Sequence, residues 1–335
     1  MRAASIKDVA NHAGVAVGTV SNVLNYPDRV AAKTRERVQQ SIDELGFVRN
    51  DVARQLRAGH SRTIGLVVLD IGNPFFSSLA RAAEDAAAEE GNAVVLGNSG
   101  HNARRELHYI DLFEEQRVQG VLISPVKDIT TRLNALAARG TKVVLVDSPA
   151  NEGTFSSVSV DDVSGGYLAT KHLLDIGRRR IAFVAGSQQF HQVTDRLSGA
   201  MKAVAEVPGA TLEVLQADDL TVLAGREVGE SLTTRSLEQL PDGLFCANDL
   251  LALGVMQALT MIHTIRIPED VALVGYDDID FAASAVVPLT SVRQPTALIG
   301  RTAIELLTEQ LAAPDAEPRS VVFKPELVVR ASTGG

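Results

Sequence analysis

SIKDVANHAGVAVGTVSNVLN, residues 5–25, has the pattern of two short helices joined by a tight turn. Ser5 is a favourable helix N-cap, and Asp8 stands three positions later, where a capping box has its second partner. Apolar side chains then recur at helical spacing up to Ala13, which predicts the first helix. Gly14 tolerates a positive φ and therefore predicts the turn.

The second predicted helix, about Val17 to Leu24, has an apolar and a polar face. Its short polar side chains suit contacts to phosphates and base edges. A third amphipathic helix over residues 33–45 closes the unit, which predicts a helix-turn-helix DNA reader. An ordinary three-helix subdomain that binds nothing fits the same spacing. The predicted core consists of Ile6, Val9, Ala10, Ala13, Val20, Val23, Leu24, Val38, Ile42 and Leu45.

The charge distribution favours the DNA reader. Residues 1–62 contain ten Lys and Arg against six Asp and Glu, a net charge of +4. The whole chain of 335 residues carries −9, so the remainder carries −13. A basic head on an acidic body is typical of a polyanion-binding module joined to a domain with another task.

The head and the segment after it also resemble a known family. KDVANHAGVAVGTVSNVLN, then KTRERV and VARQLRAGHSRTIGLVV, is similar to the lactose-repressor (LacI/GalR) family of bacterial transcription regulators, and the likeness continues along the whole chain. It implies an effector-controlled repressor of carbohydrate-use genes that binds double-stranded operator DNA as a homodimer. The residues that the resemblance places on DNA are Ser5, Val17, Gly18, Thr19, Ser21, Asn22, Asn25, Arg29, Thr34, Ala53, Leu56 and Arg57.

The segment GFVRNDVARQLRAGHSR, residues 46–62, joins the head to the rest of the chain. Asn50 can cap a helix of two turns, which Gly59 can end. A helix this short is marginal in water, so the plain interpretation is a linker helix that docks on the body. The resemblance implies instead a hinge, residues 50–61, that pairs with its twin in the minor groove, where Leu56 is the wedge between bases.

From residue 62 the sequence repeats a pattern of apolar strand, loop, helix and glycine. The strands are near-continuous Val, Ile and Leu runs, as in parallel sheets that helices cover on both faces. The pattern starts again near residue 179, which predicts an α/β body of two doubly wound parallel subdomains. This layout also resembles periplasmic sugar-binding proteins, the family's body fold. We expect subdomain one at about 62–160 plus 293–323, and subdomain two at about 161–292 plus 324–335, beside a head at 1–49.

Individual elements of the body follow from the same pattern. We expect strands at 64–69, 93–97, 120–123, 142–146, 211–215, 243–246 and 271–275. Helices are expected at 76–90, 103–116, 129–139, 195–206, 222–235, 249–262 and 297–311, the last returning to subdomain one.

Ligands of open parallel sheets bind beyond the carboxyl ends of the strands. Here that rule collects carboxylates, amides and two phenylalanines, which suit a polyhydroxylated ligand. Asp and Asn at strand ends are also common turn and cap residues, so each position has a purely structural alternative. The set comprises 70–76, 98–99, 124–125, 147–148, 248–249 and 277–278, with Asp161 and Gln294 where the chain crosses between subdomains, and Arg196 as a forked donor.

The resemblance narrows this set. Arg196 in DRLSG, Asn248 in CANDLLALG and Asp277 in GYDD match the family's effector contacts. The segment just before Arg196 varies with the effector and is expected to set specificity. The predicted effector-binding residues are Phe75, Phe76, Asp147, Asp161, Phe190, Gln192, Arg196, Asn248, Asp277 and Gln294.

We predict no catalytic, metal or cofactor site. A phosphate-binding glycine loop is absent, and Gly97-Asn98-Ser99-Gly100 has the wrong spacing for a nucleophile elbow. Of the seven histidines, His101 and His108 are expected to be surface residues rather than zinc ligands. The single cysteine, Cys246, is expected in a buried strand and fits a reducing cytoplasm.

The head departs from the family pattern at two helix starts. Ala16 and Ala31 stand where relatives usually place a capping Ser, and each loss should cost about 0.5–2 kcal/mol of helix-end stability. Gly18, at a leading base-reading position, has no side chain to read with. Specificity is therefore expected to rest on Val17, Asn22 and the hinge. The ending STGG lacks a heptad-bearing tail, which favours a dimer over a tetramer.

Two other functions fit parts of the sequence. One is a small-molecule-binding protein of transport or sensing, including a cytoplasmic sensor without sequence-specific DNA binding. The start MRAASIKD is no signal peptide, and no apolar run approaches the ~18–20 residues of a membrane span, so we expect a cytoplasmic protein without a membrane partner. The other is an enzyme of sugar metabolism, which no nucleophile, metal or cofactor constellation supports.

Overall fold

The computed structural model describes residues 4–47, 61–150, 153–186, 190–236, 238–262 and 265–335. The chain divides into two compact units, Met1–Ser61 and Arg62–Gly335, which we name the head and the body. The predicted hinge helix, with Ala53, Leu56 and Arg57, lies outside the described residues.

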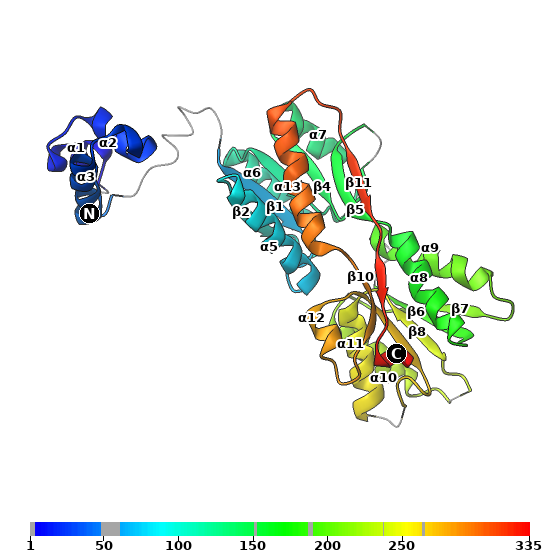
Figure 1. Ribbon diagram of the computed structural model, residues 1–335. Helices are drawn as coiled ribbons and strands as arrows, with labels where there is room; N and C mark the ends of the chain where they lie inside the picture. Colours follow the sequence, from blue (N-terminus) through cyan, green and yellow to red (C-terminus); the bar gives the residue numbers. More distant parts are fainter. Residues whose placement is uncertain (1–3, 48–60, 151–152, 187–189, 237, 263–264) are drawn as a thin grey trace. The chain divides into compact units, whose positions relative to one another are not determined.

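The head is a bundle of three short helices (Figure 1). They are α1 (Ile6–Ala13), α2 (Val17–Asn25) and α3 (Ala32–Leu45), with the short turn η1 (Pro27–Arg29) before α3. All ten predicted core residues belong to one apolar cluster, in which Val9, Val20 and Val38 are fully buried. The three-helix prediction is therefore confirmed.

The ends of the head helices follow local sequence signals. The predicted capping box is present, because Ser5 N donates to Asp8 Oδ2 at 2.8 Å and Asp8 N donates to Ser5 Oγ at 3.4 Å. Gly14 has a φ of 61° and ends α1, as predicted. No side chain caps α2 or α3 at Ala16 and Ala31, so both starts lack this stabilisation.

Two parallel-dominated sheets with helices around them make up the body (Figure 1). The first sheet has the strand order β11-β5-β4-β3-β1-β2, and its pairs are all parallel. We call this sheet and its helices lobe one. They are β1 (Thr63–Val68), α5 (Pro74–Glu89), β2 (Ala93–Asn98), α6 (Ala103–Glu115), β3 (Gly120–Ile123), α7 (Thr130–Ala138), β4 (Lys142–Val146), β5 (Ser156–Val160), α13 (Thr296–Ala312) and β11 (Ser320–Phe323).

The second sheet has the order β12-β10-β9-β8-β6-β7, with only the edge pair β10–β12 antiparallel. We call this sheet and its helices lobe two. They are α8 (Asp162–Asp175), β6 (Arg180–Ala185), α9 (His191–Ala205), β7 (Thr211–Gln216), α10 (Val222–Leu232), β8 (Gly243–Cys246), α11 (Asp249–Gln257), η2 (Ala258–Ile262), β9 (Ala272–Asp277), α12 (Asp280–Ala283), β10 (Thr290–Arg293), β12 (Glu326–Val328) and η3 (Ala331–Thr333).

Each lobe buries its own apolar core. In lobe one, α5 and α13 cover one face of the sheet and α6 and α7 the other, so successive β1 residues such as Leu66 and Val67 enter separate clusters. Lobe two has one continuous core, which includes Cys246 as a buried strand residue. The predicted doubly wound α/β class is confirmed.

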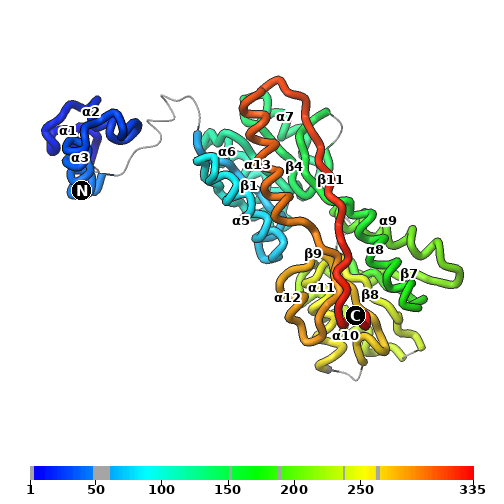
Figure 2. Tube along the Cα trace, viewed as in Figure 1, coloured from blue at the N-terminus to red at the C-terminus, as the bar shows by residue number. Residues whose placement is uncertain are grey.

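The chain passes between the lobes three times. It leaves β5 at Val160 and starts α8 at Asp162, returns from β10 to α13, and passes from β11 to β12. Figure 2 shows the last passage as the red segment that runs from one lobe into the other. Polar residues at these passages therefore lie where the two lobes face each other.

Some predicted element bounds are wrong. Helix α9 starts at His191, four residues before the prediction, and no side-chain cap at Phe190 marks that start. The helix predicted over 249–262 changes to π geometry at Ala258. Strand β5 was not predicted, because SSVSV lacks an apolar run. It is nevertheless buried, and its Ser157 Oγ donates to Ser320 Oγ on the neighbouring strand β11.

Candidate ligand cleft and DNA-reading head

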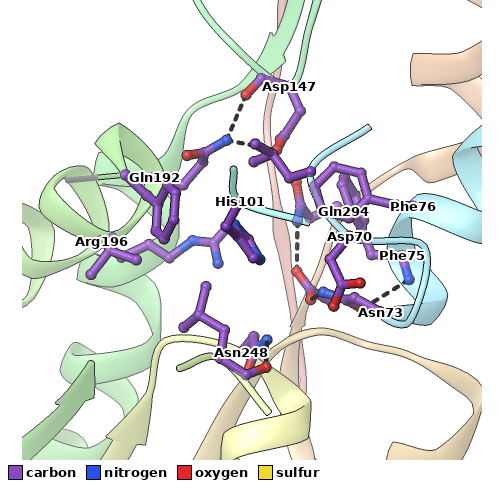
Figure 3. A pocket seen from close by; sticks show the side chains of 15 residues that line it. Asp70, Asn73, Phe75, Phe76, His101, Asp147, Gln192, Arg196, Asn248 and Gln294 are labelled. Carbon is purple, nitrogen blue, oxygen red and sulfur yellow. Dashed lines mark hydrogen bonds between the residues drawn. The ribbon is translucent and has the colours of Figure 1, made fainter. Parts of the chain in front are cut away.

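A cavity lies between the two lobes, beyond the carboxyl ends of β1, β4, β8 and β9 (Figure 3). Its empty volume is about 490 Å³, including solvent at its mouth, so it has room for a small molecule. The lining residues are Leu69, Asp70, Asn73, Phe75, Phe76, His101, Asp147, Phe190, Gln192, Val193, Arg196, Leu220, Asn248, Asp277 and Gln294.

Arg196 is positioned by the close packing of α9 on α8. The two helices touch through glycines, and a Cβ added at Gly166 would lie 2.0 Å from the Arg196 carbonyl oxygen. Arg196 Nε donates to Asp162 Oδ1 at 2.8 Å, and Nη1 donates to the Ala247 carbonyl at 2.6 Å. The guanidinium also lies 3.6 Å from the centre of the Tyr276 ring. The cavity is thus lined by a buried cation that is held on three sides.

Asp277 ends β9 and joins the lobes through an amide. Its Oδ2 accepts from Asn73 Nδ2 at 3.0 Å, and its Oδ1 accepts from Gln294 Nε2 at 2.8 Å. Asn73 Oδ1 in turn accepts from Phe75 N, so the same side chain caps α5 in lobe one. Burial raises the pKa of Asp277, against the lowering effects of Arg196 and the two amides.

Asp147 ends β4 and makes a second connection between the lobes. Gln192 Nε2, on α9 of lobe two, donates to the Asp147 carbonyl at 2.9 Å and to Asp147 Oδ2 at 2.8 Å. Burial raises the pKa of Asp147 to about 8, and the nearby Asp162 carboxylate acts in the same direction. Both Asp147, with a φ of 54°, and Asp277, with a φ of 107°, adopt the left-handed backbone that non-glycine residues rarely occupy. This strain at two facing strand ends is typical of a functional site.

Aromatic rings cover two other parts of the cavity wall. The His101 ring, from lobe one, lies 4.6 Å from the Phe190 ring of lobe two, centre to centre. Phe75 and Phe76 lie edge to face at 4.9 Å on the first turn of α5. The cavity therefore combines flat apolar surfaces with carboxylates and amides, a combination that suits a ring bearing polar substituents.

The head presents short side chains on α2. Val17, Gly18, Asn22, Asn25 and Arg29 are exposed, and Thr19, Ser21 and Thr34 are half-buried. Asn25 Nδ2 donates to Ser21 Oγ at 3.2 Å and to the Ser21 carbonyl at 2.8 Å, and Ser5 is engaged in the capping box. An exposed aromatic that the sequence reasoning missed, Tyr26, stacks with Arg29 at 4.7 Å.

Comparison with known proteins gives consistent matches for both units. Residues 5–50 match the model of bacterial regulatory proteins of the lacI family, and residues 170–333 match a periplasmic binding protein-like domain. The transcriptional repressor PurR of Vibrio campbellii is 34% identical over 334 residues, which is 98% of each chain. The chain belongs to the lacI family of bacterial regulatory proteins.

Solved structures of lacI-family regulators have the same fold along the chain. The transcriptional regulator CelR in complex with cellobiose is 33% identical with a TM-score of 0.73, covering 98% of this chain and 99% of that one. The lac repressor dimer bound to operator and the anti-inducer ONPF is 26% identical with a TM-score of 0.84, covering all of both chains. This lacI-family protein is a DNA-binding transcriptional repressor with a ligand-binding domain.

The cavity of this lacI-family repressor brings together nine of the ten residues predicted at the effector site. The exception is Asp161, which does not line the cavity. Its two carboxylate oxygens accept from Ser164 N at 2.9 Å and Ser164 Oγ at 2.6 Å, so it caps α8. The neighbouring Asp162, which was not predicted, is the partner of Arg196.

Other predictions for the cavity are also corrected. His101 was expected on the surface but lines the cavity, whereas His108 is exposed as predicted. Asp249, collected by the strand-end rule, instead accepts from Ser291 Oγ at 2.6 Å and Ile279 N at 2.9 Å inside lobe two. Leu69, Val193 and Leu220 were missed, because an apolar residue near a strand or helix end does not differ from a core residue in sequence.

Searches of the described residues add two observations. They contain no group of three His, Cys, Asp or Glu side chains placed to hold a metal ion. Within the same part of the chain, no helix is both long and apolar enough to cross a bilayer.

We expect the thermal stability of the body to fall as the pH rises from 5 to 8, and to fall less in Asp147→Asn. An Asp in the unfolded chain loses its proton near pH ~3.9, whereas folded Asp147 keeps its proton up to about pH 8. Between these values the folded state binds the extra proton, so stability decreases with pH. Melting temperatures measured across this range test the difference.

Asp315→Asn, which changes the exposed turn after α13, is the matched control and should keep the wild-type slope. The other buried carboxyls with raised pKa, Asp249 and Asp277, remain in every variant and cancel in the comparison. Equal slopes for wild type and Asp147→Asn would mean that folded Asp147 is already ionised.

Proposed function

We propose that a sugar or sugar derivative binds in the inter-lobe cavity and thereby changes the affinity of this repressor for its operator, which controls carbohydrate-use genes. The observation that carries this proposal is the lining itself. Four amide side chains, three carboxyls and Arg196 face one space together with aromatic rings. Hydroxyls of a sugar can donate to the carboxyls and accept from the guanidinium, while its C–H faces pack on the rings.

The comparisons support a sugar at this site. The solved relative CelR, 33% identical over nearly the whole chain, is a complex with cellobiose. We extend that ligand class, and not the particular sugar, to this chain. The proposed contacts are Phe75, Phe76, Asp147, Phe190, Gln192, Arg196, Asn248, Asp277 and Gln294.

The two connections between the lobes offer a route for control. The bonds Asn73–Asp277 and Gln192–Asp147 both cross the cavity, so a ligand that competes for these carboxyls changes how the lobes close on each other. Such a change need bias the DNA-binding state by only about 1–3 kcal/mol to alter operator affinity by roughly 5- to 150-fold.

Operator titration tests this proposal. Fluorescence anisotropy with a labelled fragment from upstream of this protein's own gene would be repeated with cellobiose, ribose, glucose and galactose. We expect at least one sugar to change the apparent Kd within the stated range. Unchanged operator affinity, together with unchanged melting temperatures, for every sugar would contradict the sugar class.

We further propose that the chain acts as a cytoplasmic homodimer and catalyses no reaction. Its head, 1–49, would read the major groove through α2 with Val17, Thr19, Ser21 and Asn22, supported by Ser5, Gly18, Asn25, Arg29 and Thr34. The hinge, 50–61, would enter the minor groove with Ala53, Leu56 and Arg57. The solved lac repressor, a dimer bound to operator, supports this arrangement for a chain that matches it throughout.

Leu56→Ala should weaken operator binding roughly 10- to 100-fold. A leucine wedge buried between bases gains about 1.5–3 kcal/mol from burial, and alanine loses most of it. Ligand affinity of the free protein should not change, because Leu56 is outside the cavity lining. The measurement is anisotropy titration of both proteins on the same operator at one salt concentration.

Val52→Ala, on the same predicted hinge face, provides the comparison, since it also shortens an apolar side chain but is not the proposed wedge. If Leu56→Ala binds operator as tightly as the wild type, the minor-groove wedge is wrong. Control would then act through the spacing of the two heads.

A further inference from the structure

Three buried polar atoms of the cavity lining have no hydrogen-bond partner within the described structure. They are Asp147 Oδ1, Gln294 Oε1 and His101 Nδ1. Asp147 is 4% exposed and Gln294 is 3% exposed, so solvent at the surface does not reach these side chains freely. Unpaired polar atoms in such a setting destabilise the protein unless a bound molecule supplies the missing bond.

The neighbouring bonds determine what kind of partner these atoms require. Gln294 Nε2 is used by Asp277 Oδ1, so the side chain presents its oxygen, which can only accept. Gln192 Nε2 holds the other oxygen of Asp147, which leaves Oδ1 for a second group. A carboxylate accepts and a carboxylic acid also donates, and a hydroxyl group satisfies either form.

The charges around the cavity disfavour an anionic ligand. Asp70, Asp147 and Asp277 line it with carboxyls. Arg196, the sole Lys or Arg among the described lining residues, is already paired with Asp162 at 2.8 Å. Burial lowers the pKa of His101, so its ring is neutral at neutral pH and adds no positive charge. A phosphate group would therefore lose its hydration without gaining an unpaired cation.

These features lie on both sides of one space. Asp147 and His101 belong to lobe one, and Gln294 follows β10 of lobe two (Figure 3). Phe190 stacks on His101, and this aromatic pair faces the ring of a ligand while its substituents reach the polar atoms. We propose that the effector is an uncharged polyhydroxylated compound, and that Asp147, Gln294 and His101 select it by taking hydrogen bonds from its hydroxyls. This inference rests on the proposed sugar site and adds that phosphorylated sugars are rejected.

The first experiment is calorimetric titration of the full-length protein with matched pairs. Glucose is compared with glucose 6-phosphate, ribose with ribose 5-phosphate, and galactose with galactose 6-phosphate, with cellobiose and adenine as further probes. We expect an uncharged sugar to bind and its phosphate to bind at least about tenfold more weakly. A phosphate that binds more tightly than its parent sugar overturns this inference while leaving the sugar site intact. Binding of adenine alone, or of no probe, overturns the proposed sugar class itself.

The second experiment assigns the selection to named atoms. Asp147→Asn keeps the shape but can turn an amide donor toward the cavity, so sugar affinity should fall about tenfold or more and the gap between sugar and phosphate should narrow. His101→Phe keeps the stacking with Phe190 but removes Nδ1, and should lose about threefold to tenfold in sugar affinity. Asp315→Asn makes the same change of net charge as Asp147→Asn outside the lining and should behave as wild type.

Circular dichroism at the titration temperature shows whether each variant is folded before its affinity is compared. If folded Asp147→Asn binds the sugar as tightly as the wild type, with the same preference over the phosphate, the assignment to Asp147 is wrong. Equal sugar affinity of His101→Phe and wild type removes His101 from the selecting set. Either result contradicts the inference as stated.

Discussion

Operator affinity should fall by roughly 10³–10⁵-fold when the salt concentration rises from 50 to 200 mM, because DNA releases a counterion for each phosphate that the protein neutralises. The head carries +4 on a chain of −9. Its basic side chains Lys7, Arg29, Lys33, Arg35 and Arg37 are exposed. Two heads and two hinges then neutralise ~6–10 phosphates, which sets the expected slope of log K against log salt.

The measurement is an anisotropy titration at four or more salt concentrations with constant pH and temperature. Asp315→Asn makes the body one unit less acidic and should leave the slope unchanged, because the slope counts phosphate contacts rather than net charge. Removal of one contacting Lys or Arg by Gln should lower the slope by about one per site. Affinity that does not vary over this range would show that the exposed basic side chains do not contact phosphates.

Arg196→Ala should abolish the response to ligand and destabilise the body. A guanidinium that binds hydroxyls makes charge-assisted bonds worth about 1.5–3 kcal/mol each, so ligand affinity should fall roughly 10- to 100-fold. The same change leaves Asp162, which is 5% exposed, without its partner. An unpaired buried charge costs about 3–5 kcal/mol. Thermal melting with and without the sugar measures both effects.

A double variant separates the two effects. Arg196→Met with Asp162→Asn removes both charges and should recover much of the stability, since a buried ion pair adds little over an uncharged pair of similar size. It should not recover the ligand response. Operator binding without ligand should persist in the double variant, because α2 belongs to the other unit. A normal ligand-induced melting shift in Arg196→Ala would contradict the placement of Arg196 at the site.

The local parts of this fold could be predicted from sequence because their causes are local. The capping box of Ser5 and Asp8 and the turn at Gly14 depend on residues within one helical turn of each other. Alternation of apolar strands with helices likewise predicts the doubly wound class. The rule that ligands lie at strand carboxyl ends then found Asp147, Asn248 and Asp277.

The sequence alone thus determined the two units, the fold class and most polar residues of the cavity, because these follow from short-range pattern and strand polarity. Only the tertiary structure distinguished Asp161 from Asp162, since consecutive residues at a helix start point in different directions, one to the cap and one to Arg196. It also brought His101 onto Phe190 and left Asp147 Oδ1 without a partner. Those contacts join side chains more than forty residues apart, and they depend on how the two lobes pack, which no local pattern encodes.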